Sequence, residues 1–410
     1  MKKYITIISV NFYPEDSSTG LYTTEMADYL AAKGHQVSII TGVPYYPQWE
    51  IHKAYLNKKR FLHEKKGAID IYRYKLYVPS APSFLKRIIH LTDFTLGSIR
   101  NAFRIGDCDL VISVVPFTSN IFLGWLLSKK KKAKLWAHIQ DFEFDAAIES
   151  GMAGKKSGFK SIVFTVLFWL EKSLLKKTHV ASTISFGMME KLHSKTNTPA
   201  FYFPNWVNPL KINPEKSNKH AFLRSSKFKI VYSGNIGAKQ DWDFFLRVVH
   251  HFINDIEVEF IIVGDGGMKN WLLGETKACK NVKHFDPIAL NKLSDLLCSA
   301  DVHILFQKSA VIDTVMPSKL LGMMSSGKPS IVTGNLKSEV AKVFEISQGG
   351  FFHDANDFTG VVENIIKLKN NTPLAHKKGV MARDYMISRF SEDKVLTIFE
   401  NKIREVLDEK

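Results

Sequence analysis

The stretch Lys229–Gln240, KIVYSGNIGAKQ, decides the fold class of this chain. Its β-branched start predicts a strand, Gly234 and Gly237 predict a loop, and helical spacing begins at Trp242. A strand that runs through a glycine loop into a helix is the first half of a βαβ unit. Further strand patterns alternate with helical ones at Glu257–Val263, Val282–Phe285, Val302–Phe306 and Pro329–Val332. The second half of the chain therefore predicts a parallel sheet.

The first half of the chain repeats this alternation. Its strand patterns are Tyr4–Val10, Gln36–Thr41, Ala68–Tyr74, Leu110–Val115, Lys134–Ile139 and His179–Ser182. Residues 203–226 carry three prolines and four asparagines without periodicity, which is typical of a linker. We therefore predict an α/β fold with two Rossmann-like, doubly wound domains facing a central cleft. The expected parts are residues 1–205, residues 206–388, and a last helix over residues 389–410 that could cross back to the first domain.

The composition is that of a folded chain. Of 410 residues, 45% are hydrophobic and 23% are charged, a balance that argues against a disordered protein. Three cysteines without metal-ligand spacing predict neither a disulfide framework nor a zinc site. The first residues read as a strand rather than a signal peptide, and no apolar run is long enough to span a bilayer. We expect a cytoplasmic protein without a metal site.

The net charge is strongly positive and unevenly distributed. Lys and Arg number 56 against 40 Asp and Glu, a formal charge of +16. Residues 1–205 hold 28 basic and 16 acidic side chains (+12), whereas residues 206–410 hold 28 and 24 (+4). Such an excess indicates an anionic partner: nucleic acid, a membrane surface or a phosphorylated substrate. Because no helix-turn-helix or aromatic-basic RNA motif is present, we expect no nucleic-acid partner.

The segment Pro79–Arg104 combines basic residues with apolar ones at helical spacing. Such a helix is typical of proteins that lie on an anionic membrane surface. A core helix with a solvated basic face is the alternative. Together with the lysine run at residues 129–132, this segment supplies much of the positive excess of the first half.

A polar loop follows the first strand pattern of the second half. It contains Ser233, Gly234, Asn235, Gly237 and Lys239. The glycines let the backbone approach a ligand closely, and the lysine supplies a positive charge for a phosphate. A glycine-rich turn with a solvated lysine is the alternative.

Later loops of the second half carry similar signals. Gly264 and Gly266 follow the next strand, a position that suits nucleotide binding but also a tight strand–helix turn. Gln307 ends a later strand, and Ser318 and Lys319 stand at a predicted helix start. A lysine opposes the helix dipole at that place, which indicates a negatively charged ligand.

The first half offers two weaker motifs. Gly20 ends the loop NFYPEDSSTG (residues 11–20) before a helix, where backbone N–H groups and the helix dipole favour a phosphate. An ordinary capped loop is the alternative. His138 and Asp141 stand three residues apart at a strand end, where they could orient sugar hydroxyls or accept a proton. A core histidine and a helix cap explain them equally well.

Taken together, these motifs resemble glycosyltransferase family 4, whose members have the GT-B fold. The loop SGNIGAKQ (residues 233–240) and the segment MPSKLLGMMSSGKPSIV (residues 316–332) carry the likeness in the second half. In the first half, PYYPQW (residues 44–49), HIQDFE (residues 138–143) and FPNW (residues 203–206) are similar to colanic-acid-type fucosyltransferases and N-acetylfucosaminyltransferases. The resemblance covers nearly the whole chain.

The resemblance implies retaining transfer of a sugar, such as fucose or N-acetylfucosamine, from a UDP- or GDP-sugar donor. The implied acceptor is a lipid-linked saccharide of the undecaprenyl-diphosphate type. Such a reaction serves capsule, O-antigen or exopolysaccharide synthesis at the inner face of the cytoplasmic membrane. It requires no metal and no other cofactor.

Residue by residue, Gly20 matches the family's glycine loop near the donor diphosphate, and Lys239 matches its phosphate-binding lysine. Ser318 and Lys319 match the PSK variant of the subgroup, and Glu339 matches a later acidic position. The resemblance implies that Lys239, Lys319 and backbone N–H groups of residues 17–20 and 234–237 stabilise the departing diphosphate. The leaving phosphate would accept the proton of the acceptor hydroxyl, and His138 and Asp141 would orient the donor sugar or the acceptor.

Two glutamates of the family have no counterpart here. They are separated by seven residues, and their positions fall on Thr314 and Gly322. This departure keeps an alternative open, namely a catalytically inactive sugar-nucleotide-binding partner of another glycosyltransferase.

Overall fold

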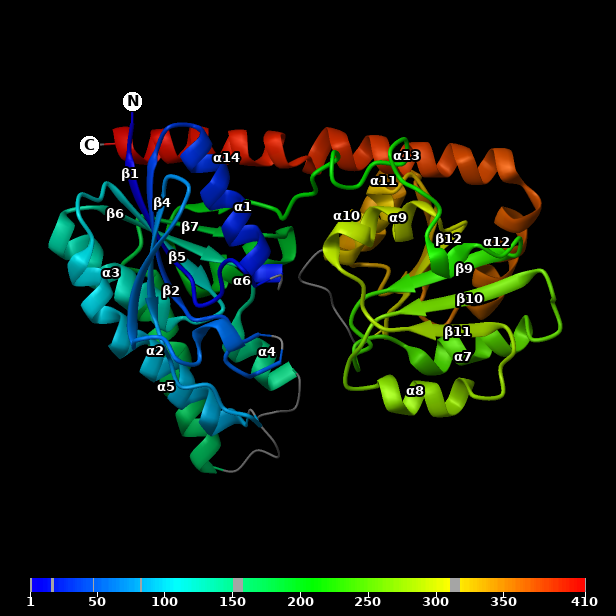
Figure 1. Cartoon of the computed structure of the whole chain (residues 1–410), viewed down its shortest axis with the longest axis horizontal. Coiled ribbons are helices and arrows are strands. Elements are labelled where there is room, and N and C mark those ends of the chain that lie inside the picture. Colours follow the sequence, from blue (N-terminus) through cyan, green and yellow to red (C-terminus); the bar gives the residue numbers. More distant parts are fainter. Residues whose placement is uncertain are drawn as a thin grey trace. The chain divides into compact units, whose positions relative to one another are not determined.

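The computed structural model describes residues 2–15, 18–46, 48–81, 83–149, 158–309 and 318–409, and the chain forms two compact units (Figure 1). The first unit contains Met1–Pro204 together with Leu396–Lys410, and the second contains Asn205–Val395. Each unit is built around a mostly parallel sheet covered by helices. The predicted α/β class is confirmed.

The sheet of the first unit has the strand order β3-β4-β2-β1-β5-β6-β7-β8. All neighbours are parallel except β3 and β4, an antiparallel pair at one edge. The strands are β1 (Tyr4–Ile8), β2 (Gln36–Gly42), β3 (Phe61–Lys66), β4 (Ile69–Tyr74), β5 (Leu110–Val115), β6 (Lys134–Ile139), β7 (Val180–Thr183) and β8 (Ala200–Tyr202). The helices are α1 (Ser18–Ala32), α2 (Phe84–Arg104), α3 (Ser119–Lys131), α4 (Glu143–Glu149), α5 (Gly158–Leu175), α6 (Phe186–Lys195) and most of α14 (Glu392–Asp408).

The core of the first unit includes a helix from the far end of the chain. Every residue of β5 is buried, as expected for a central strand of a parallel sheet that is covered on both faces. Phe399 of α14 stacks on Phe203 with ring centroids 4.1 Å apart, and it lies 5.0 Å from Trp136. The last helix therefore packs into the first unit.

The sheet of the second unit has the order β11-β10-β9-β12-β13-β14 and is parallel throughout. This is the order of a Rossmann sheet, 3-2-1-4-5-6. Its strands are β9 (Phe228–Ser233), β10 (Val258–Val263), β11 (Val282–Phe285), β12 (Val302–Phe306), β13 (Ser330–Gly334) and β14 (Gly350–Asp354). Its helices are α7 (Trp242–His251), α8 (Lys269–Thr276), α9 (Leu293–Cys298), α10 (Ser318–Ser325), α11 (Glu339–Ser347), α12 (Phe358–Asn370) and α13 (Thr372–Phe390).

The sequence patterns missed three strands, β3, β8 and β14, and each of them lies at an edge of its sheet. β3 reads FLHEKK, and its charged residues hide the strand pattern because one face of this edge strand is solvated. β8 has only three residues, and β14 begins with a glycine, which strand propensity disfavours. Sheet edges are therefore where the sequence pattern was least informative.

Candidate functional site

The candidate site of the second unit lies where its strand order reverses. β9 pairs with β10 on one side and with β12 on the other. In doubly wound sheets such a reversal opens a crevice at the carboxyl ends of the strands, where ligands bind. β9 leads into the predicted glycine loop and β12 into Gln307, and an antiparallel bridge joins Gln240 to Gln307. The glycine loop therefore starts at the ligand-binding edge of this sheet.

The two predicted glycine turns pack directly against each other. A Cβ on Gly264 would lie 1.9 Å from the carbonyl oxygen of Gly234, so only glycine fits this contact. Gly266 has a φ of +155°, and a Cβ there would lie 2.4 Å from the carbonyl oxygen of Ile236. The turns are also joined by hydrogen bonds, because the Gly234 N–H donates to Val263 O (2.9 Å) and the Ile236 N–H donates to Asp265 O (2.8 Å). These glycines are needed for backbone packing.

This cross-linking corrects one expectation about the loop. The N–H groups of Gly234 and Ile236 are already used between the turns, and the Gly237 N–H donates to Gln240 Oε1 at 3.2 Å. Three of the four backbone donors of residues 234–237 are thus not free to bind a diphosphate as predicted. The physical reason is that a tight turn satisfies its own polar groups when it is half-buried.

Lys319, in the first turn of α10, lies against the first glycine turn. Its ammonium donates to Tyr232 Oη (2.5 Å) and to the carbonyl oxygen of Asn235 (3.3 Å), and it lies 4.6 Å from the centre of the Tyr232 ring. A Cβ on Gly234 would lie 2.9 Å from Lys319 Cε. The structure thus brings Lys319, Gly234 and Asn235 together, and their role in binding a donor stays a prediction.

Tyr232 is a functional candidate that the sequence reasoning missed. Its hydroxyl donates to the Asn235 carbonyl at 2.5 Å and accepts from Lys319. Burial raises its pKa, so the phenol stays protonated and keeps this donor–acceptor role. The signal in the sequence is an aromatic hydroxyl one residue before the end of a buried strand that leads into the loop.

The remaining predicted residues of the second unit differ in exposure. Lys239 and Ser318 are exposed, and the Lys239 ammonium makes no hydrogen bond or ion pair to any described residue. Gln307 is buried, and its N–H donates to Thr333 O at 3.1 Å. Glu339 is half-buried at the start of α11. Ser233, at the end of β9, is half-buried as well.

Of the two positions that lack a family glutamate, the structure describes only Gly322. Thr314 lies outside the described residues. Gly322 lies on α10, and a Cβ there would lie 3.2 Å from Leu297 Cδ1. At this second position the glycine faces an apolar neighbour.

His138, in the first unit, is a buried histidine at the end of β6. Its Nε2 accepts from the Gln140 side-chain amide (3.0 Å), so its Nδ1 carries the proton and donates to Ser182 Oγ (2.9 Å). Burial lowers its pKa to about 3, so the ring is neutral near pH 7. This geometry favours the alternative of a core histidine, because both ring nitrogens are engaged.

The other two candidates of the first unit are Asp141, which follows β6, and Gly20, which lies in α1. Asp141 is exposed, and its negative charge adds to burial in raising the pKa of Glu143. Glu143 accepts hydrogen bonds from the N–H groups of Phe117 (2.9 Å) and Thr118 (2.7 Å). Gly20 lies within the first turn of α1, which begins at Ser18, and not in the loop before the helix as predicted.

Glu15 is a second residue that the sequence reasoning missed. It follows β1, where the strand order of the first sheet also reverses. One carboxylate oxygen accepts from the N–H groups of Tyr45 and Tyr46, both at 2.7 Å, and the other accepts from the Asn11 amide at 2.9 Å. Burial raises its pKa against these hydrogen bonds. The carboxylate thus ties the turn after β2 to the turn after β1.

Aromatic side chains surround the turn that Glu15 holds. Tyr45 lies edge-on to Trp49 with ring centroids 5.5 Å apart, and its hydroxyl is 3.0 Å from Nε2 of the buried His90. Tyr46 remains 41% exposed. The Arg87 guanidinium lies 5.2 Å from the centre of the Trp49 ring. Tyr45, Tyr46 and Trp49 of the PYYPQW motif therefore form an aromatic cluster with an exposed edge at Tyr46.

The described residues lack both a metal-binding cluster and a membrane-spanning helix. They contain no group of three or more His, Cys, Asp or Glu side chains arranged to hold a metal ion. Within the same residues, every helix is too short or too polar to cross a bilayer.

Comparison with known protein families covers both units. Residues 19–206 match the profile described as glycosyl transferase 4-like domain, and residues 227–371 match the profile described as glycosyl transferases group 1. The chain is similar to the putative colanic acid biosynthesis glycosyl transferase WcaI of Escherichia coli K12, with 33% identity over 98% of this chain and 99% of that protein.

Solved structures agree on the fold. The sucrose-phosphate synthase of Thermosynechococcus elongatus aligns with a TM-score of 0.76 at 13% identity, over 100% of both chains. Anabaena HepE, solved in complex with UDP, aligns with a TM-score of 0.69 at 10% identity, over 98% of this chain and 100% of that one.

Proposed function

The chain belongs to glycosyltransferase family 4 and has the GT-B fold, and from this we propose a specific reaction for it. A sugar of the 6-deoxyhexose class, such as fucose or N-acetylfucosamine, moves with retention from a nucleoside-diphosphate donor to a lipid-linked saccharide. The product contributes to a bacterial surface polysaccharide. The name of the relative at 33% identity, which refers to colanic acid, supports this setting.

The observation that carries the donor assignment is the convergence of both glycine turns and Lys319 at the strand-order reversal of the second unit. Family membership makes a nucleotide-sugar the expected ligand of such an edge, and a UDP complex is known for the structural neighbour HepE. We assign the donor diphosphate to the surface beside Lys239 and Lys319. Tyr232 holds Lys319 in place.

In the proposed step, the acceptor hydroxyl oxygen attacks the anomeric carbon from the face that the diphosphate leaves. The bond from that carbon to the β-phosphate oxygen breaks, and the departing phosphate takes the hydroxyl proton. Negative charge develops on the leaving group, so nearby fixed cations stabilise the transition state more than the ground state. Lys239 fits this role because its ammonium is exposed and makes no bond to a described residue.

For the first unit we propose different roles for the two predicted residues. His138 is a positioning residue that holds the Gln140 amide, because its ring stays neutral and its Nε2 accepts from that amide. Asp141, exposed one residue further on, is the group that would contact a sugar hydroxyl. Gly20 remains a candidate for contact with the donor through the first turn of α1.

We propose that helices α2 and α5 place this unit on an anionic membrane surface. On α5, Ile162, Val166 and Trp169 are 64%, 49% and 64% exposed at spacings of four and three residues, so they form one apolar stripe. On α2, the exposed side chains Leu85 and Ile89 stand four residues apart in the same way. The basic residues of α2, Lys86, Arg87, Arg100 and Arg104, supply the attraction to anionic lipid.

A panel of sugar nucleotides tests the donor assignment by thermal shift, because a ligand of the folded state raises the unfolding temperature. We expect stabilisation by one 6-deoxyhexose donor and not by the matching hexose donor. Stabilisation by hexose donors alone would refute the sugar class. Donor binding without either transfer or donor hydrolysis would instead support the inactive-partner alternative.

The variant Lys239→Ala tests the role of the exposed ammonium. We expect turnover to fall by about 10²-fold or more, because a cation that stabilises the leaving group acts mainly in the transition state. Lys277→Ala is the matched control, since Lys277 is an exposed lysine at the end of α8. Equal turnover in the two variants would refute the assignment.

Vesicle co-sedimentation tests the membrane face. Trp169→Ser combined with Ile162→Ser should weaken binding to vesicles that contain anionic lipid, whereas Ile256→Ser should not, although Ile256 is 81% exposed in the second unit. Undiminished binding of the double variant would contradict the role of α5.

A further inference from the structure

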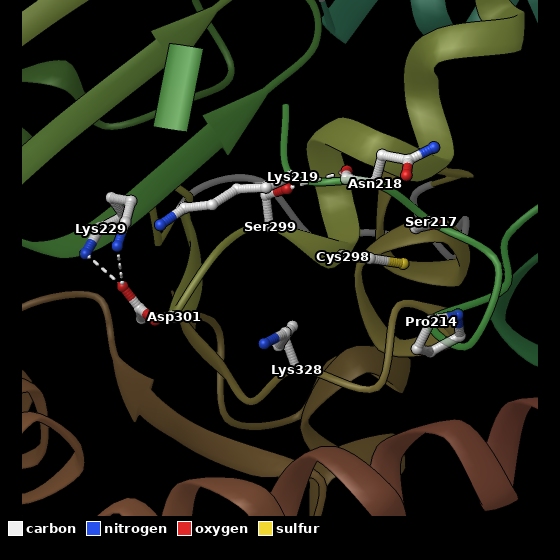
Figure 2. A pocket seen from close by; sticks show the side chains of 9 residues that line it. All are labelled: Pro214, Ser217, Asn218, Lys219, Lys229, Cys298, Ser299, Asp301 and Lys328. Atoms are coloured by element: carbon white, nitrogen blue, oxygen red, sulfur yellow. Dashed lines mark hydrogen bonds and ion pairs between the residues drawn. The ribbon is translucent and has the colours of Figure 1, made fainter. Parts of the chain in front are cut away.

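A polar cavity of about 260 Å³ lies at the opposite edge of the second unit's sheet (Figure 2). Lys229 is the second residue of β9, Asp301 directly precedes β12, and Lys328 stands two residues before β13. Ser217 and Lys219, from the segment that precedes β9, also line the cavity. Because these strands are parallel, the cavity is about 17 Å from the glycine turns, the length of a six-residue strand. The cavity is therefore distinct from the proposed donor site.

The charges around this cavity are not balanced. Its lining contains Lys219, Lys229 and Lys328 but only one carboxylate, that of Asp301. Asp301 is already paired with Lys229, with 3.0 Å between ammonium and carboxylate, and its Oδ2 also accepts the Lys229 backbone N–H at 2.8 Å. Lys219 and Lys328 make no hydrogen bond or ion pair to any described residue. Two positive charges thus remain uncompensated around one cavity, and Figure 2 labels both lysines among the residues that line it.

Lys328 is the less exposed of the two lysines, since it is half-buried whereas Lys219 is exposed. Because its ammonium has no hydrogen-bond or ion-pair partner among the described residues, its charge is available to an anion in the cavity. Its field reaches the buried His303, whose pKa falls through burial first and through the charge of Lys328 second. Lys328 makes no ion pair with a carboxylate of the described residues, and Asp301, the one carboxylate in the lining, is held by Lys229.

We propose that this cavity binds a small phosphate-bearing dianion, either inorganic phosphate or the phosphomonoester of a sugar. Two free ammonium groups match the charge of a phosphate dianion, and lysine binds phosphate as a point charge without demanding a fixed geometry. The cavity is slightly smaller than the roughly 300 Å³ at which drug-sized ligand sites begin, which limits the ligand to about the size of a monosaccharide phosphate. The site lies outside the transfer chemistry and is occupied independently of the donor.

Cys298 provides a built-in reporter for the cavity. It lines the cavity and is half-buried, whereas Cys108 and Cys279 are buried. The full chain, saturated with UDP to occupy the donor site, is treated with a maleimide while inorganic phosphate or a hexose phosphate is titrated. We expect labelling of Cys298 to slow as the anion binds, and calorimetry to give the same dissociation constant. A lower constant for the hexose phosphate assigns the site to the ester, and equal constants assign it to inorganic phosphate.

The double variant Lys219→Gln, Lys328→Gln removes the two uncompensated charges. We expect phosphate to bind at least about tenfold more weakly, as for the loss of charge-assisted bonds. The variant should fold at least as stably as the natural chain without phosphate, because no ion pair is broken. Lys277→Gln with Lys280→Gln removes the same charge from exposed positions and should bind normally. Unchanged binding in the first variant, equal losses in both, or no phosphate binding by the natural chain would each overturn the proposal.

Discussion

The contact between the two glycine turns leads to a sharp expectation for Gly264→Ala. A Cβ at this position would lie 1.9 Å from the carbonyl oxygen of Gly234, whereas real Cβ atoms essentially never approach closer than 3.0 Å. The turns must therefore separate by at least 1.1 Å, the difference between 3.0 and 1.9 Å. The obstructing atom belongs to the backbone, so no side-chain rotation relieves the contact.

The size of the effect follows from this displacement. It stretches the hydrogen bonds from Gly234 and Ile236 that join the turns, and it moves the loop against which Lys319 lies. A shift of about 1 Å in a positioned site can cost about 10²-fold in rate. That loss corresponds to about 2.7 kcal/mol of transition-state stabilisation. We expect kcat/KM for the donor to fall by roughly this factor.

The assay compares Gly264→Ala with Gly267→Ala in the same loop. A Cβ on Gly267 would meet nothing within 4 Å, and its backbone is outside the left-handed region. Gly267→Ala should therefore keep its turnover and gain about 0.4–1 kcal/mol of unfolding free energy, because alanine restricts the unfolded chain. Steady-state kinetics over a donor series, with thermal unfolding of each variant, separates lost positioning from lost folding.

Two results would refute the reasoning. If a folded Gly264→Ala variant turned over the donor as fast as Gly267→Ala, the packing of the turns would not position the donor. If both variants lost activity equally, the loop would act through flexibility and not through the contact with Gly234.

Buried polar groups of the first unit support three shorter predictions. The pKa of His138 is lowered from 6.5 in the unfolded chain to about 3 in the folded protein, so the folded state loses stability as the pH falls below 6.5. The free energy of unfolding, measured with urea, should therefore fall between about pH 7 and about pH 5. This fall should be about 2 kcal/mol larger in the natural chain than in His138→Gln. Lys195→Met should cost about 3–5 kcal/mol of unfolding free energy, measured by thermal unfolding. The variant leaves the carboxylate of Glu171, which is 2% exposed, without the ammonium that lies 2.5 Å away. The control Lys191→Met should cost about 1 kcal/mol or less in the same measurement. Glu15→Ala leaves two backbone N–H groups without an acceptor and should cost about 2–4 kcal/mol, measured by urea unfolding.

The fold could be predicted from the sequence where burial makes the pattern unambiguous. The interior strands β5 and β6 begin and end at the predicted residues because both faces of a central parallel strand require apolar side chains. The edge strand β3 could not be recognised in this way. It pairs with β4 through backbone hydrogen bonds, and its exposed face holds His63 and Lys65. On its other face, Glu64 pairs with Arg73. The pairing of an edge strand depends on its neighbouring strand, which the local sequence does not specify.

The candidate site was likewise predictable only in part. The role of the glycines at 234, 264 and 266 in tight turns could be predicted, because glycine directly after a buried strand usually serves a turn. The use of their N–H groups could not, since the partners are carbonyls of Val263 and Asp265 about thirty residues away. His138 shows the same limit, because its spacing to Asp141 says nothing of the burial that keeps the ring neutral.

The ammonium of Lys319, at the start of α10, finds its partners within the protein. A lysine in a first helical turn opposes the helix dipole, and the sequence therefore indicated a bound anion at that point. In the structure the ammonium is already met by the Tyr232 hydroxyl, the Asn235 carbonyl and the Tyr232 ring. These contacts account for its placement without a ligand, so the dipole conflict alone does not argue for a donor. The donor assignment rests instead on where this lysine is held, beside two glycine turns whose backbones touch at the strand-order reversal. Lys239 has no such contacts among the described residues, and it is the cation that the proposed mechanism assigns to the leaving phosphate.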